Sequence, residues 1–234
     1  MLLLTAGVAA ADTKIVRMSH TDAFTMMGQT QPAQDEQSVT WMGDGRMRMD
    51  RGGSTFIVRP DLKQLLFVDH GTKTYRKVDL PIDMTKLMPP GMGEQMMQMM
   101  KFQATVTPSA ETRPVEKWTA RRFDVSLTSM MMNMKSTVWA TKEVKLDIST
   151  YNDLHEQIVL MQPGMSAVIN EMRKIEGFPV LTEGVVTMMG SEVKNSEKVT
   201  AVEEGLTAPA GTYDPPAGYT EQEFDFMKLQ QSKE

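Results

Sequence analysis

Five strand-like runs follow one another over residues 37–78, and a short turn signal separates each run from the next. The runs are QSVTWM, RMRMD, STFIVR, KQLLFV and KTYRKV. Asp44-Gly45 suits a tight hairpin because both residue types tolerate positive φ, and Pro60-Asp61 presets a turn. Loops this short can join only antiparallel neighbours. The pattern therefore predicts a continuous antiparallel meander, which is the strongest constraint that this sequence places on its fold.

More strands and two helices are predicted after the meander. Alternation of apolar and polar residues indicates strands over 117–128, 135–141, 184–189 and 192–202. Apolar residues at helical spacing indicate helices over 151–161 and 165–176, and Thr150 with Asp153 resembles a capping box that opens the first. The Pro-rich stretch GTYDPPAGY near the end is expected to wrap the surface as an irregular strap. The predicted fold class is α+β and mainly antiparallel β.

The first residues predict an exported protein. MLLLTAGVAAADTK is an apolar run that ends in small residues, and Ala9 with Ala11 forms an A-x-A cleavage site before Asp12. We therefore expect residues 1–11 to be the remnant of a signal peptide and residues 12–234 to form a single domain in the periplasm or outside the cell. The chain has no cysteine, so disulfides cannot contribute to its stability.

The net charge and the hydropathy pattern limit the kinds of partner that the protein can bind. The chain has 25 Lys and Arg against 30 Asp and Glu, a net charge of -5. Such a balance argues against nucleic acid, which needs a basic surface. No apolar run after the signal segment approaches the length needed to span a membrane, so no membrane span is expected.

Enzyme motifs are not convincing in this sequence. Ser191 and Lys194 match Ser-x-x-Lys, but they lie in a predicted strand and the companion motifs are missing. There is no Gly-x-Ser-x-Gly, no His-Glu-x-x-His and no phosphate-binding loop. We expect no catalytic activity and no cofactor.

Methionine is the unusual residue, with 24 in 234 positions. The segment GMGEQMMQMMKF follows Pro89-Pro90, and its methionines recur at intervals of about four, which predicts a short helix with a thioether stripe. Filling a core is the commoner use of such a stripe, but flexible, polarizable thioethers also adapt to varied apolar ligands. The candidate hydrophobic ligand-binding residues are Met88, Met92, Met96, Met97, Met99, Met100 and Phe102.

Several stretches together resemble an uncharacterised family of secreted bacterial proteins, which is similar to the LolA/LolB-like superfamily of periplasmic lipoprotein carriers and receptors. The stretches are GDGRMRMDRGGSTFIVRPDLKQLLFVDHGTKTYRKVDLP, KWTARRFDV, STVWATKEVKLD, EGFPVLTEG and a Pro-Gly-Tyr-like ending. The resemblance implies a LolA-like fold, in which an incomplete, open β-barrel is covered by helices and an apolar cavity lies between them.

The function predicted from the sequence is therefore that of a non-enzymatic periplasmic binding or carrier protein. Its partner would be a hydrophobic small molecule or lipid, such as an acyl chain, and the methionine helix would be a flexible cover. One alternative is a copper(I)-binding or sequestering protein, because thioethers select Cu(I) and Met92, Met96 and Met99 share one helical face. Another is a protein-interaction module whose Met clusters dock a protein partner.

The copper alternative can be tested directly. Titration with Cu(I) against a competing chelator should show at most weak binding, because the chain has no thiolate and its three histidines are isolated in sequence. Replacing Met92, Met96 and Met99 by Leu keeps the side-chain volume while removing sulfur. Tight binding that this triple substitution abolishes would contradict the expectation and favour the copper function.

Overall fold

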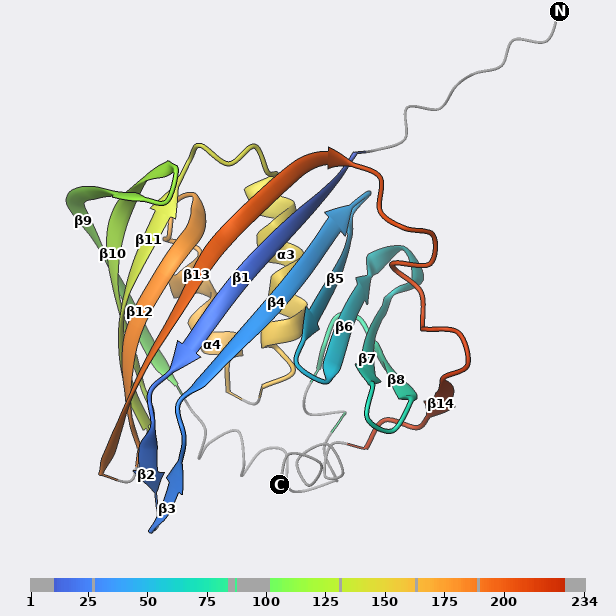
Figure 1. Cartoon of the computed structure of the whole chain (residues 1–234), viewed down its shortest axis with the longest axis horizontal. Helices are drawn as coiled ribbons and strands as arrows, with labels where there is room; N and C mark the ends of the chain where they lie inside the picture. The colour runs from blue at the N-terminus through green and yellow to red at the C-terminus, as the bar shows by residue number, and fades with distance from the viewer. Residues whose placement is uncertain are drawn as a thin grey trace, which may run out of the picture.

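The computed structural model describes residues 11–26, 28–83, 87, 102–130, 132–162, 164–188 and 190–225. These residues form a twelve-stranded sheet, a two-stranded ribbon, two α-helices and a short 3-10 helix (Figure 1). The strands are β1 (Asp12–Thr21), β2 (Phe24–Met26), β3 (Gln29–Gln31), β4 (Gln34–Gly43), β5 (Arg46–Arg51), β6 (Ser54–Arg59), β7 (Gln64–Asp69), β8 (Thr74–Asp79), β9 (Gln103–Val115), β10 (Trp118–Thr128), β11 (Met132–Thr141), β12 (Phe178–Met188), β13 (Ser191–Leu206) and β14 (Thr220–Gln222). The helices are η1 (Pro60–Leu62), α3 (Ile148–Val159) and α4 (Ser166–Met172).

The predicted meander is confirmed. Strands β4 to β8 follow one another in the sheet in chain order, and each pairs antiparallel with the next. At the β4–β5 turn, Asp44 and Gly45 have φ of +51° and +67°. Positive φ at both central residues is the requirement of a type I′ hairpin, whose twist matches that of the flanking strands.

Strand β1 joins the two halves of the sheet. It pairs antiparallel with β4 on one side and with β13 on the other, so Ile15 lies between Thr40 and Val202. The full order is β14-β8-β7-β6-β5-β4-β1-β13-β12-β11-β10-β9. The first and the last long strands of the chain are thus neighbours at the centre of the sheet.

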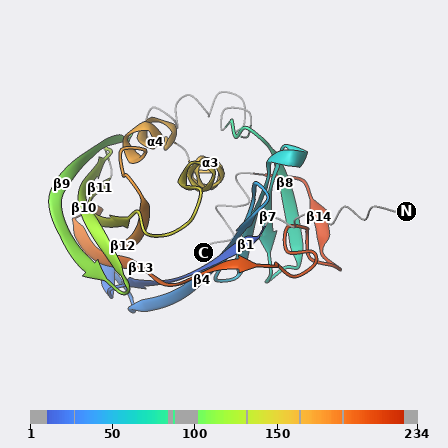
Figure 2. The same cartoon turned by 90° about the horizontal axis from the view of Figure 1, so that it is seen from above.

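The expected incomplete barrel covered by helices is wrong. Strands β9 and β14 are the two edges of one sheet that does not close, and β14 pairs parallel with β8, so the sheet is mixed. None of the twelve strands has a covering helix of its own: in the described part of the chain, only the α-helices α3 and α4 are longer than one turn, and they lie on the concave side of the sheet (Figure 2). Alternating residues specify strands and their faces, but the curvature of a whole sheet and the number of helices that cover it depend on contacts between distant segments, which no local pattern encodes.

Other elements differ from the sequence-based expectation at their ends. Helix α3 begins at Ile148 because Asp147 is its N-cap and accepts hydrogen bonds from the backbone N–H groups of Ser149 and Thr150. The expected capping box at Thr150 is therefore wrong by three positions. Strand β9 was not expected, because much of it is exposed and it lacks a clean alternation.

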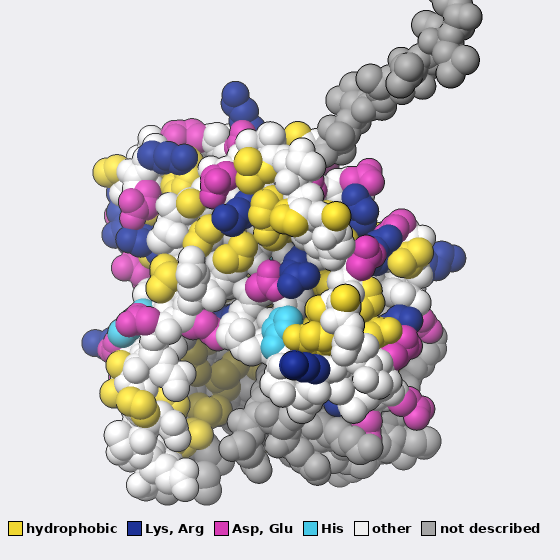
Figure 3. Space-filling model, turned by 45° about the vertical axis from the view of Figure 1, so that its right-hand side comes forward, with side chains coloured by type: hydrophobic (Ala, Val, Ile, Leu, Met, Phe, Trp, Pro, Cys, Tyr) yellow, Lys and Arg dark blue, Asp and Glu magenta, His cyan; other side chains and the backbone are white. Residues whose placement is uncertain are grey.

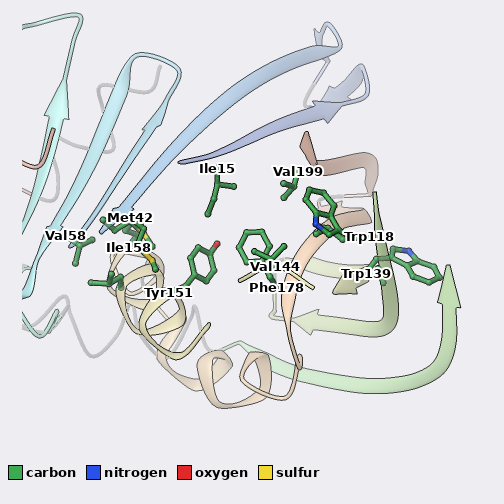
Figure 4. Close-up of a cluster of buried hydrophobic side chains, with 14 of the residues drawn as sticks. Ile15, Met42, Val58, Trp118, Trp139, Val144, Tyr151, Ile158, Phe178 and Val199 are labelled. Carbon is green, nitrogen blue, oxygen red and sulfur yellow. The ribbon is translucent and has the colours of Figure 1, made fainter. Parts of the chain in front are cut away.

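The main core lies between α3 and the concave face of the sheet (Figure 4). Tyr151, Leu154 and Ile158 of α3 are buried and pack with strand residues such as Ile15 and Phe178. Full burial of a large apolar side chain contributes about 1.5–3 kcal/mol. The rings of Tyr151 and Phe178 form a T-shaped pair with centroids 5.2 Å apart, which is an arrangement that aromatic rings favour.

The chain after β13 runs along the meander and ends in the short edge strand β14 (Figure 1). Tyr213 is buried there, and its hydroxyl donates a 2.7 Å hydrogen bond to the Asp12 carboxylate. Burial and this carboxylate raise the pKa of Tyr213, so the hydroxyl stays protonated and continues to donate. The expected wrapping of the surface by this Pro-rich segment is confirmed.

Replacing Tyr213 by Phe should lower the free energy of unfolding by about 1–3 kcal/mol, because the buried Asp12 carboxylate loses a donor. The matched control is Tyr75→Phe, which removes an exposed hydrogen bond to Glu221 and should cost less than about 0.5 kcal/mol. Urea unfolding followed by circular dichroism measures both. Equal losses in the two variants would contradict the structural role of the buried bond.

Candidate functional site

A buried arginine lies inside the concave face of the sheet. Arg17 of β1 is 6% exposed, and its guanidinium donates to the Tyr151 hydroxyl at 2.9 Å and to Thr40 Oγ1 at 3.4 Å. It also lies over the Phe178 ring, 5.3 Å from its centroid, and 3.5 Å from a Glu197 carboxylate oxygen. A charge buried without partners is very costly, so these contacts hold the side chain in one position.

An apolar cavity of about 180 Å³ lies between the two helices and strands β10 and β11. Sheet and helix both contribute to it, and most of its walls are aliphatic or thioether side chains. The lining residues are Val125, Leu127, Met134, Asn152, His155, Glu156, Val159, Met165, Val168, Ile169, Met172 and Arg173. Figure 3 shows that the lower part of one face is hollowed and that hydrophobic atoms lie on the floor of the hollow.

His155 and Glu156 are the titratable groups that line this cavity from α3, and His155 is the one without an ion pair among the described residues. Its ring stacks on Tyr151 with centroids 5.6 Å apart and an interplanar angle of 13°. Protein atoms surround the His155 side chain, which is half-buried because one side of it faces the cavity. Burial, and to a lesser extent the charge of Arg17, lowers the pKa of His155 to about 4. The imidazole is therefore neutral at neutral pH, which keeps this wall of the cavity uncharged.

The charged groups at the cavity form ion pairs with one another. Arg173, just after α4, donates to Glu156 at 2.6 Å and to Asp153 at 2.9 Å, and both carboxylates belong to α3. These ion pairs connect the two helices. They also leave the neutral side chains as the surface that a ligand would contact.

A larger and more open recess of about 710 Å³ lies over strands β9 to β13 and the end of β1. Polar side chains dominate it, including His20, whose ring nitrogens lie 2.7 Å from Asp35 and 3.0 Å from Asp22. Hydrogen bonds to these carboxylates raise the pKa of His20, that to Asp35 more strongly. Lys135 and Lys194 line the same recess. Because Lys135 follows Met134 in β11, the two side chains point to opposite faces of the sheet.

The site predicted from the sequence falls mostly outside the described residues. Met88, Met92, Met96, Met97, Met99 and Met100 all lie there, so the methionine cover and the copper alternative stay predictions. Phe102 is described, and it is half-buried just before β9. Among the residues that the structure describes, no three His, Cys, Asp or Glu side chains are grouped to hold a metal ion.

The structure adds residues that sequence reasoning missed. Neither Arg17 nor His155 was proposed as a site residue. One signal was present for Arg17: it follows Ile15 by two residues, so a charge stands on the apolar face of a strand. No comparable signal marks His155, because its burial depends on how α3 and α4 pack.

No helix of the described chain has both the length and the apolar character needed to cross a bilayer.

Comparison with known proteins gives weak structural likenesses alone. No protein-family model matches the chain, and no curated protein matches its sequence. PNGF-II in a C2 crystal form matches 95% of this chain at 10% identity with a TM-score of 0.45, and the chain spans 32% of PNGF-II. An uncharacterized conserved protein from Thermus thermophilus matches 92% of this chain and 91% of its own at 7% identity, with a TM-score of 0.46.

A third structural likeness is weaker still. A putative outer membrane lipoprotein-sorting protein domain from Vibrio parahaemolyticus matches 87% of this chain and 88% of its own at 7% identity, with a TM-score of 0.20. Likenesses at this level support no conclusion about family, fold or activity.

Protonation of His155 should destabilise the fold in acid. The unfolded chain binds this proton near the ordinary pKa of 6.5 and the folded chain near 4. Between these values the unfolded state holds more protons, so stability falls as the pH falls, by up to roughly 3 kcal/mol. The contribution is complete above pH 6.5 and is lost on the way down to pH 4.

Urea unfolding at neutral pH and at about pH 4.5 checks this expectation. Because the raised pKa of His20 works in the opposite direction, the informative quantity is the difference between the wild type and His155→Gln. The variant should lose the acid destabilisation in this window. An NMR titration in which His155 titrates near its ordinary pKa would contradict the prediction.

Proposed function

We propose that the protein is a noncatalytic binding or carrier protein for a hydrophobic ligand, such as a lipid or an acyl chain, in the periplasm or outside the cell. The observation that supports the proposal is the apolar cavity between α3, α4 and strands β10 and β11. Ligand sites are typically concave and mostly apolar with few polar groups. The aliphatic and thioether walls of this cavity fit that description.

The volume of the cavity limits the bound group. An apolar protein cavity of about 150 Å³ holds a molecule of the size of benzene. The 180 Å³ here therefore suits one end of an acyl chain rather than a whole lipid. The rest of a longer ligand would extend beyond the cavity.

The charges around the cavity favour an uncharged bound group. His155 is neutral at neutral pH, and the Arg173 guanidinium is already shared between Glu156 and Asp153. A carboxylate or phosphate placed in the cavity would compete with these acids for the one cation, so it would lose its hydration without a free partner. We infer that the head group of an amphiphilic ligand stays outside the cavity.

Filling the cavity should abolish binding. Met134→Trp places a larger side chain in the cavity wall, and it should weaken the binding of a fluorescent fatty acid at least about tenfold. The matched control is Met18→Trp on β1, where the methionine is exposed and does not line the cavity; binding should change less than about twofold. Fluorescence titration measures both, and unlabelled fatty acids of different length should compete.

A second variant tests binding with a substitution that should not disturb the fold. Met172 lines the cavity and is 39% exposed, so Met172→Gln should make the wall polar at little cost to the fold. This variant should also weaken binding. A wild-type protein that does not bind the probe, or cavity variants that bind it as tightly as the wild type, would refute the proposed function.

A further inference from the structure

Three hairpin segments of the large sheet and the ribbon carry no charged residue. They span residues 23–34, 125–134 and 184–191, and each contains at least two methionines. The first charged residue after the third segment is Glu192. Lys, Arg, Asp and Glu make up 24% of the chain, so three such stretches at hairpins are unusual. The segments hold the β2–β3, β10–β11 and β12–β13 turns.

The three turns meet at one end of the molecule. Met132 of β11 pairs directly with Met188 of β12, so the β10–β11 and β12–β13 turns are neighbours. Ser191 at the start of β13 donates a 2.7 Å hydrogen bond to the Thr25 carbonyl of β2, which adds the ribbon. This end, called the methionine end below, comprises Phe24, Met26, Met130, Met132 and Met188 and lies at the bottom of Figure 1.

The fold itself does not require uncharged turns. Other turns of the same sheet carry charges, with Asp44 at the β4–β5 turn, Lys73 at the β7–β8 turn and Glu116 at the β9–β10 turn. At the methionine end, Met130 is instead 88% exposed. Figure 3 shows no Lys, Arg, Asp or Glu atoms over the lower left part of its face, at the same end of the molecule.

Two lysines lie at one level above the methionine end. Lys135 and Lys194 both pair with Val185, from opposite sides, so the three side chains point to the same face. Each lysine is three residues along its strand from Met132 or Ser191, which is about 10 Å at the rise of a β-strand. Neither has an ion-pair partner among the described residues. Glu192 is the acidic residue between this level and the tips.

We propose that the methionine end docks on a lipid bilayer, with the hairpin tips in the outer acyl region and Lys135 and Lys194 at the head-group phosphates. Apolar surfaces that bind an interface enter it by about 5–10 Å, which matches the distance from the tips to the lysines. Lysine stems lie along apolar surface while their ammonium groups reach phosphates. Three neighbouring hairpin tips at one end of the molecule also suit a soft, flat surface better than a preformed protein groove.

The test is flotation of the full chain with vesicles of phosphatidylcholine, with and without phosphatidylglycerol, in the absence of any cavity ligand. The wild type should bind both vesicles. The double variant Met130→Asp with Met132→Asp should reduce the bound fraction roughly tenfold, because charges must then enter the acyl region. The control Met18→Asp changes an exposed methionine of mid-sheet β1 and should bind within about twofold of the wild type.

A second pair of substitutions tests the lysines. Lys135→Gln with Lys194→Gln should lower binding to phosphatidylglycerol vesicles several-fold and leave phosphatidylcholine binding nearly unchanged. Circular dichroism confirms folding, which a change at the exposed Met130 should not disturb.

Three results would overturn the proposal: no vesicle binding by the wild type, unchanged binding by the methionine variant, or a wild-type dimer that this variant dissociates. The last would identify a second copy of the chain as the occupant. Because the assay contains no cavity ligand, its failure is independent of the proposed function.

Discussion

The packing of α3 into the concave side of the sheet is the contact on which the rest of the structure depends. A single sheet has two faces, and the apolar one must be covered. Tyr151, Leu154 and Ile158 provide that cover at the centre, where β1 joins the two halves of the sheet. Arg17 fixes the helix further, because it is buried and donates to the Tyr151 hydroxyl. An arginine held this way cannot shift without leaving a buried charge unpaired.

The cavity exists because α4 covers only a small part of the concave face. Helix α4 has only seven residues and contacts β9 rather than the centre of the sheet. The space left between the helices and β10–β11 is bridged at its rim by Arg173 and otherwise lined by apolar side chains. Packed protein interiors rarely leave such a space, so its apolar walls suit a ligand rather than water.

The sequence predicted most of the strands, but it did not predict the overall arrangement of the sheet and its helices. Turn residues such as Asp44-Gly45 act within a few positions, so the meander could be predicted from local chemistry alone. The helix-covered open barrel came from the resemblance alone, and it depends on how far a sheet curls and on which distant segments cover it; the structure instead has one mixed sheet with edges β9 and β14. The candidate site shows the same difference between what local sequence specifies and what long-range packing specifies. Methionine richness is visible in composition, whereas the burial of His155 arises from two helices whose docking no local pattern specifies.

The apolar face connects the cavity with the methionine end. Leu127 and Met134 line the cavity, and Val186 is aligned with them across the sheet. Met132 lies two residues beyond Met134 and is paired with Met188, so the same face continues to the hairpin tips. A ligand chain that moves along this face would meet mostly apolar side chains. Methionine suits such a path because its flexible thioether rearranges around different shapes.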